Sequence, residues 1–140
     1  MAEFTAVNLQ SVEANQNILF TETPVQPTRG ISHREGSGIV RTSGSVGQCR
    51  ARYLVSFSGN IQIPATGTAG EISLAISVDG EPLASTQMIV TPTVAEALFN
   101  VSAQAYIDVS CGCCVSIGVK NTSTQAIEVQ NSNLIVVRVA

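Results

Sequence analysis

Charged residues are the component this sequence has least of. Only 12% of its 140 residues are Asp, Glu, Lys or Arg, against about 25% in typical domains, and the formal net charge is −3. The seven basic residues are scattered, so the sequence gives no reason to expect nucleic-acid binding. Because the mean hydropathy is +0.27, a monomer would expose much apolar or weakly polar surface. We therefore expect the chain to cover that surface by meeting copies of itself.

Long apolar runs are also missing. No stretch approaches the roughly 20 apolar residues that cross a bilayer, so we expect no membrane partner. The N-terminus, MAEFTAVNLQSVEANQ, lacks the basic region and apolar core of a secretory signal. We therefore expect the protein to be made in a cytoplasm, and either to stay there or to leave by cell lysis or by assembly into a particle.

The common catalytic motifs are absent. GxSxG, HExxH, DxDxDG calcium loops and glycine-rich phosphate loops do not occur. The single histidine, His33, stands in a loop beside Arg34 and Glu35, and no serine or cysteine motif accompanies it. We predict that these three residues form a loop contact cluster, within the subunit or at a subunit contact. The expectation is a protein that is not an enzyme and that holds no cofactor or metal.

The four cysteines allow three interpretations. Cys49, Cys111, Cys113 and Cys114 equal the number of ligands in a structural zinc site, but three of them crowd into the four positions of CGCC. A disulfide from Cys49 to Cys111 is geometrically possible, although a chain that is not exported usually keeps its thiols reduced. We favour the third interpretation, in which they are small buried hydrophobic residues at the start of a strand.

The most regular pattern lies between Glu71 and Ser85. Ile72, Leu74, Ile76 and Val78 alternate with small or polar residues, which is the period of a half-buried β-strand. Asp79-Gly80 follows, and this dipeptide favours a type I′ hairpin turn. Pro82 lacks an N–H group, so we expect the returning strand to begin irregularly. An antiparallel hairpin is therefore predicted in the middle of the chain.

Similar short segments flank the hairpin on both sides. We expect strands over residues 4–9, 17–20, 30–33, 38–41, 50–59, 101–109, 113–120 and 127–139, the last being one long strand or two broken near residues 131–133. No convincing helix and no internal repeat is found. The pattern predicts an all-β, antiparallel jelly-roll sandwich of about ten strands, forming one domain. Residues 1–16 are expected to form an N-terminal arm and first strand, and residues 17–140 the jelly roll.

Alternation also assigns side chains to faces. The predicted core contains Tyr53, Val55, Phe57, Ile72, Leu74, Ile76, Val78, Val115, Ile117 and Val119. Leu54 and Tyr106 are large residues on the otherwise polar faces of their strands. Because the chain carries so little charge, we predict that these faces meet a neighbouring subunit.

Five segments in this order resemble the trimeric jelly-roll family that includes tumour necrosis factor and the complement globular heads. They are NILF (17–20), GISHREGSGIV (30–40), RYLVSFSGN (52–60), ISLAISVDGEPL (72–83) and NLIVVRV (133–139). The resemblance extends to the C-terminal domains of bacterial spore-surface collagen-like glycoproteins, although no Gly-x-y stalk precedes the domain here. A freestanding head of this kind also resembles bacteriophage decoration and head-fibre proteins. The resemblance implies a compact homotrimer that acts as a binding head or assembly module.

These observations lead to one expectation and two alternatives. The expectation is a non-catalytic, homotrimeric bacteriophage virion protein, placed on the virion surface as a capsid decoration or head fibre and attached to the capsid through the N-terminal arm. One alternative is a structural protein of the same fold on a bacterial spore or cell surface. The other is a lectin-like head that binds glycans.

Overall fold

The chain folds into two antiparallel sheets packed face to face. The computed structural model describes residues 1–28, 30–44, 50–110 and 114–140. The strands are β1 (Ala2–Ala6), β2 (Gln10–Val12), β3 (Glu22–Val25), β4 (Ile31–His33), β5 (Val40–Thr42), β6 (Ala51–Gln62), β7 (Ile72–Val78), β8 (Glu81–Pro82), β9 (Met88–Val90), β10 (Phe99–Val109), β11 (Val115–Asn121) and β12 (Ile127–Arg138).

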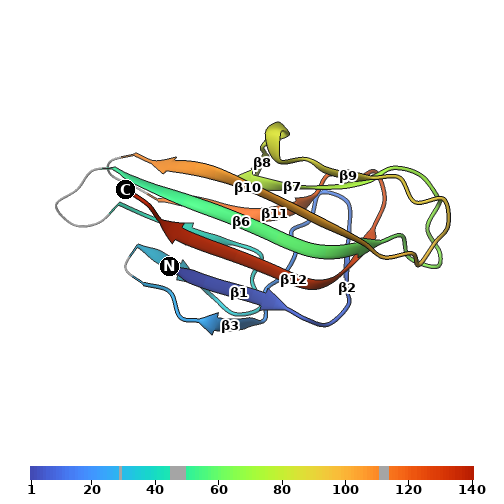
Figure 1. Ribbon diagram of the computed structural model, residues 1–140, viewed down its shortest axis with the longest axis horizontal. Helices are drawn as coiled ribbons and strands as arrows, with labels where there is room; N and C mark the ends of the chain where they lie inside the picture. Colours follow the sequence, from blue (N-terminus) through green and yellow to red (C-terminus); the bar gives the residue numbers. More distant parts are fainter. Residues whose placement is uncertain (29, 45–49, 111–113) are drawn as a thin grey trace.

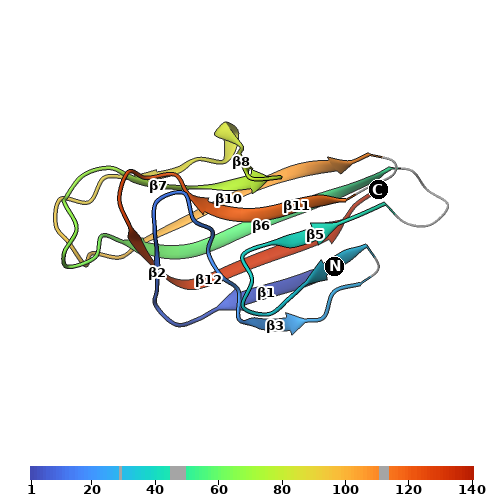
Figure 2. The same cartoon turned by 180° about the vertical axis from the view of Figure 1, so that it is seen from behind.

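Each sheet has six strands. The first, called here the β6 sheet, has the order β10-β6-β12-β1-β3, with β2 also paired to β12. The second, the β11 sheet, has the order β4-β5-β11-β7-β8, with β9 also paired to β7. Figure 1 shows the β6 sheet in front. Figure 2 shows the molecule from the opposite side, with the β11 sheet in front. The expected all-β sandwich is confirmed, with twelve strands in the described residues rather than about ten.

Helix contributes almost nothing to the fold. In the part of the chain that the structure describes, the one helical element is a 3₁₀ turn, η1 (Ala84–Thr86). None of the described helical structure is long and apolar enough to span a membrane.

The core lies between the sheets and follows the predicted alternation. Of the predicted core residues, Val78 and Val115 are half-buried and pack against the core. The other eight are buried: Tyr53, Val55, Phe57, Ile72, Leu74, Ile76, Ile117 and Val119. Alternation along β6 and β11 therefore located the inner faces correctly.

The central hairpin forms with the turn that its sequence indicates. Asp79 and Gly80 both have positive φ, 51° and 86°, as a type I′ turn requires. The returning chain pairs for only two residues at β8, passes through η1 and pairs again with β7 at β9. The predicted irregular return is thus confirmed.

Strand β7 differs from the half-buried strand that was expected. Ser73, Ala75 and Ser77, on its alternate face, are buried as well. The Ser73 hydroxyl lies 2.6 Å from the Thr122 hydroxyl, and the Ser73 amide donates to Ser123 Oγ at 2.8 Å. The turn after β11 therefore covers this end of β7, a long-range contact that local periodicity does not encode.

Of two predictions about the N-terminal segment, one is correct in part and the other is wrong. The first strand expected within residues 1–16 is present as β1, but these residues do not form a separate arm, because β1 lies between β12 and β3 within the β6 sheet and Phe4 is fully buried. Residues 17–20 do not form a strand. They make isolated bridges from Asn17 to Lys120 and from Phe20 to Ser37, while Ile18 and Phe20 still fill the core.

Candidate functional site

The candidate site is the outer face of the β6 sheet, defined here as the outward side chains of β10, β6 and β12. Register places these side chains in rows that cross the three strands. Tyr106, Leu54 and Val137 form one row, and the next row contains Gln104, Ser56 and Ile135. Further rows contain Ser102, Ser58 and Asn133, and then Asn100, Asn60 and Gln130.

This face has an apolar part and an amide-rich part. Leu54, Ile135 and Val137 are half-buried, whereas Tyr106 projects with 68% of its surface exposed. Leu54 and Tyr106 were predicted from the sequence as contact residues, and the structure places them directly opposite each other. Ile135 and Val137 were not singled out from the sequence. The signal that could have found them is the period of two along β12, where Leu134 and Val136 are the buried residues.

The polar side chains of the outer face already bond to one another. Asn60 donates from Nδ2 to Asn131 Oδ1 at 3.2 Å and accepts on Oδ1 from Asn100 Nδ2 at 3.1 Å. Asn133 Nδ2 donates to Glu3 Oε2 at 2.6 Å. Ser56 also bonds to Gln104, and Gln62 to Glu128. Because these groups are paired within the subunit, covering the face leaves few of them without a partner.

A depression of about 500 Å³ lies on this face beside the apolar rows. Its lining includes the small side chains of Ser56, Ser58, Ser102 and Ala103. Tyr106 stands two residues along β10 from Gln104, which also lines the depression. The face therefore carries both a projecting aromatic ring and a hollow.

An ion pair closes one end of the outer face. Arg52 donates from Nε and Nη2 to the two oxygens of Asp108, at 2.6 and 3.1 Å. These hydrogen bonds lower the pKa of Asp108 below its usual 3.8, and the charges of Arg52 and Arg50 act in the same direction. The same hydrogen bonds raise the pKa of Arg52. Both side chains are more than half exposed, so this ion pair contributes little to stability.

Of the predicted loop contact cluster, the structure shows contacts that hold the loop for His33. Arg34 and Glu35 are exposed, whereas the His33 ring is half-buried with its centroid 4.6 Å from that of Phe4. His33 Nδ1 lies 3.0 Å from Ile39 O, and Nε2 lies 3.1 Å from Phe20 O. A neutral imidazole donates to one carbonyl, and an imidazolium donates to both. His33 therefore holds the loop by backbone contacts, and within the described residues both ring nitrogens face carbonyl oxygens rather than a hydroxyl or thiol.

Cys114 is half-buried, and its sulfur accepts a hydrogen bond from Arg41 Nη2 at 3.1 Å. The other three cysteines, Cys49, Cys111 and Cys113, lie outside the described residues. Among the residues described, no three His, Cys, Asp or Glu side chains gather as a metal site would require.

Comparisons with known proteins agree with this geometry at the level of fold. Family models and characterised protein sequences give no match. Among solved structures, the globular domain of zebrafish complement 1qA matches with a TM-score of 0.64 and 11% identity, over 96% of this chain and 94% of that one. Murine APRIL matches with a TM-score of 0.58 and 14% identity, over 95% and 97%. The PRD1 vertex protein P5 matches with a TM-score of only 0.45 and 14% identity, over 95% and 93%, and carries no weight below. The fold is therefore the C1q/TNF-like jelly roll.

Proposed function

We propose that this chain is a non-catalytic structural protein that self-associates as a homotrimer through the outer face of the β6 sheet. The observation that carries the proposal is the pairing of Tyr106 with Leu54 on that face. They lie in a row with Val137 and beside Ile135, and the ion pair of Arg52 with Asp108 stands at the edge. Apolar residues at the centre and charge at the rim are typical of protein–protein interfaces.

The energetics of the face favour burial. An exposed tyrosine supplies a large, rigid contact area with little entropy to lose, and such residues dominate binding energy when they enter a pocket. The amides around it are bonded to each other, so their desolvation costs less than that of unpaired groups. The exposed aromatic ring and the paired amides therefore make this face suitable for a contact between subunits, and the contact requires no reactive side chain.

A threefold trimer requires a particular arrangement of this contact. Proteins with this fold usually form trimers, in which each subunit presents one patch to a different patch on the next. Tyr106 and the depression lined by Ser56, Ser58 and Ser102 are two such patches. In our proposal, Tyr106 of one subunit enters the depression of its neighbour, and the ring closes after three subunits.

We propose further that the trimer is a bacteriophage surface component, either a capsid decoration or a head fibre. The resemblance of a head of this kind to bacteriophage decoration and head-fibre proteins supports this role. Because residues 2–6 and 10–12 belong to strands of the sandwich, the proposed contact with a capsid uses surfaces of the folded domain rather than a separate arm of residues 1–16.

Photo-crosslinking tests the interface. With a benzophenone amino acid in place of Tyr106, illumination should join subunits, and mass spectrometry should find the adducts on residues that line the depression. The same amino acid at Leu98, which is 48% exposed in a loop outside the outer face, is the matched control. Crosslinks from position 98 but none from position 106 would contradict the proposed interface.

A separate experiment tests the location. Proteomics of gradient-purified virus particles from the source should detect this chain in a fixed ratio to the major capsid protein. Finding it only with spores or cell envelopes would contradict the virion role while leaving the trimer intact.

A further inference from the structure

A second pocket lies at the end of the sandwich, beyond the row that contains Tyr106. Its volume is about 470 Å³, and it is lined by Arg50, Ala51, Arg52, Asp108, Val109, Ser110 and Ala140. This volume falls within the range of roughly 300–1,000 Å³ typical of small-molecule sites.

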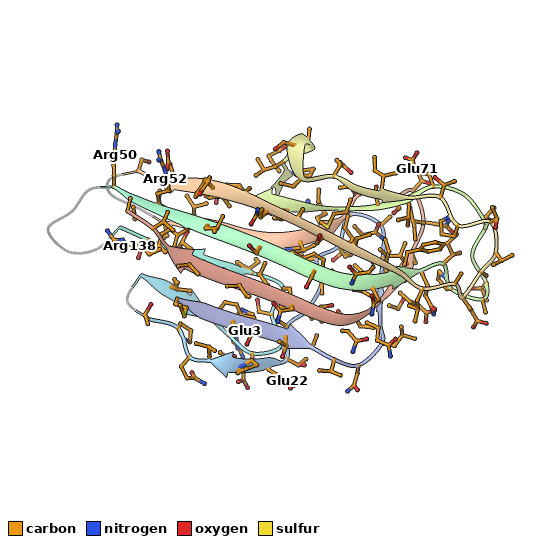
Figure 3. All side chains as sticks on the ribbon, viewed as in Figure 1. Glu3, Glu22, Arg50, Arg52, Glu71 and Arg138 are labelled. Carbon is orange, nitrogen blue, oxygen red and sulfur yellow. The ribbon has the colours of Figure 1, made fainter. Side chains whose placement is uncertain are left out.

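Positive charge gathers at this end of the molecule. Figure 3 shows Arg50, Arg52 and Arg138 together at one end of the sandwich and Glu71 at the other. Strand β12 shows the same separation, because Glu128 is its second residue and Arg138 its last, roughly 33 Å apart at about 3.3 Å per residue. A protein with a net charge of −3 thus presents a locally positive end, which favours an anionic ligand there.

The polar groups of the pocket are not those of a simple anion site. Arg52 is already engaged by Asp108, so its charge is largely neutralised. Arg50 is exposed, and it is the guanidinium of the pocket that can turn toward a bound carboxylate. The Asp108 carboxylate keeps lone pairs that can accept hydrogen bonds from hydroxyl groups, and the Ser110 hydroxyl can donate or accept. A bare phosphate or sulfate would be repelled by Asp108 and would leave these acceptors unused.

We propose that this pocket binds an acidic sugar, a ring that carries one carboxylate and several hydroxyl groups. Arg50 binds the carboxylate, while Asp108, held in place by Arg52, accepts hydrogen bonds from the ring hydroxyls. Ser110, on the other side of Asp108 from Tyr106, completes the polar lining. The ligand class is an acidic monosaccharide unit, as found at the ends of cell-surface glycans or along acidic polysaccharides.

NMR titration of the full chain tests this assignment. The probes are N-acetylneuraminic acid, whose carboxylate is on the anomeric carbon, and glucuronic acid, whose carboxylate is on the other ring carbon that is bonded to the ring oxygen. Glucose and inorganic phosphate are the comparison ligands. We expect at least one acidic sugar to bind with a dissociation constant of about 1 mM and to shift the amide signals of residues 50–52 and 108–110. Tighter binding of N-acetylneuraminic acid would indicate the ends of cell-surface glycans as the source of the ligand, and tighter binding of glucuronic acid would indicate acidic polysaccharides.

Variants separate this site from general electrostatic attraction. Arg50→Gln should weaken acidic-sugar binding at least about tenfold. Arg34→Gln, which removes the same charge from an exposed position outside the pocket, should leave the affinity unchanged. Asp108→Ala should weaken sugar binding even though it removes negative charge.

The assignment would be overturned if neither acidic sugar shifted any amide signal at about 20 mM, or if phosphate bound as tightly as the acidic sugars. It would also be overturned if Arg34→Gln weakened sugar binding as much as Arg50→Gln does, or if Asp108→Ala bound the sugar more tightly than the wild type. These results are read from sugar binding and not from the molar mass, so they are separate from the test of the trimer.

Discussion

Tyr106 lies directly opposite Leu54 in the antiparallel pairing of β10 with β6, and both side chains point away from the core. Tyr106 is the most exposed large hydrophobic side chain in the part of the chain that the structure describes, at 68%. Val137 lies in the same row, and Ile135 lies in the next row on one side, whereas the row on the other side holds the ion pair of Arg52 with Asp108. The two residues therefore belong to the apolar part of the surface on which the functional proposal depends, one row from its charged end.

The first prediction concerns the size of the Tyr106 side chain. Tyr106→Ala should weaken self-association by about 2 kcal/mol per contact, because it removes the projecting ring. It should leave the unfolding temperature of the isolated subunit almost unchanged, since the ring is exposed. Sedimentation velocity over a concentration series measures the effect. Leu98→Ala, at an exposed apolar position in a loop, is the control, and an equal loss of association there would argue against a specific face.

Adjacent positions on β6 give the second prediction. Val55 is fully buried opposite Val136, whereas Leu54 points outward. Val55→Asp should destabilise the fold by at least about 3 kcal/mol, since it places an unpaired carboxylate in the core. Leu54→Asp should fold but fail to associate. Urea denaturation followed by circular dichroism distinguishes the two variants. Similar midpoints would show that the assignment of Val55 to the core and of Leu54 to the outer face is wrong.

The third prediction concerns Asn121, the last residue of β11, which is polar and fully buried. Its Nδ2 donates to Val12 O and Gln125 O, both at 3.0 Å, and its Oδ1 accepts from Ser123 N at 2.9 Å. Asn121→Ala should cost about 2–4 kcal/mol of unfolding free energy, because several buried groups lose their partners. Asn100→Ala, at an exposed position, should cost less than about 1 kcal/mol. Equal costs in denaturant titrations would contradict this structural role.

The fourth prediction concerns alkaline pH and Tyr53. Burial raises the pKa of the Tyr53 phenol above its usual 10.0, although Arg138 and the hydrogen bond to Ser43 O oppose the shift. The folded state therefore holds this proton more tightly than the unfolded state. The resulting stability is complete below about pH 10 and is lost as the pH rises through the higher folded-state pKa.

Comparison with Tyr53→Phe checks that prediction. The hydroxyl donates to Ser43 O at 2.7 Å and lies 3.3 Å from Gly30 O, so the variant should lose about 1 kcal/mol at neutral pH. Above about pH 10, the melting temperature of the wild type should fall more steeply than that of Tyr53→Phe. Parallel curves for the two proteins would show that Tyr53 does not titrate with folding.

Much of the fold could be predicted because the signals are local. Alternation along residues 72–78 and 101–109 gave two strands, and Asp79-Gly80 gave the turn between β7 and β8. Of the two alternatives for the last segment, the single long strand is present as β12, with an irregularity rather than a break near residues 131–133. Asn131 has a φ of 56°, and the pairing of β12 with β6 shifts between Gln130 and Asn133.

What could not be predicted depends on contacts between distant segments. The segment at residues 17–20 is apolar enough for a strand, but its backbone partners are single residues on β11 and near β5, so only bridges form. His33 is placed by carbonyls of Phe20 and Ile39, which no spacing in the sequence indicates. For the candidate site, Leu54 and Tyr106 could be identified because they break the polar side of an alternating pattern. The ion pair of Arg52 with Asp108 needed the register of β6 with β10.

The molar mass in solution tests the central claim most directly. Light scattering coupled to size exclusion, at micromolar concentration, should give three times the 14.6 kDa chain mass for the wild type. It should give the mass of a single folded chain for Leu54→Asp. A wild-type protein with the mass of one chain, or a Leu54→Asp variant that remains a trimer, would contradict the claim that the outer face of the β6 sheet joins the subunits.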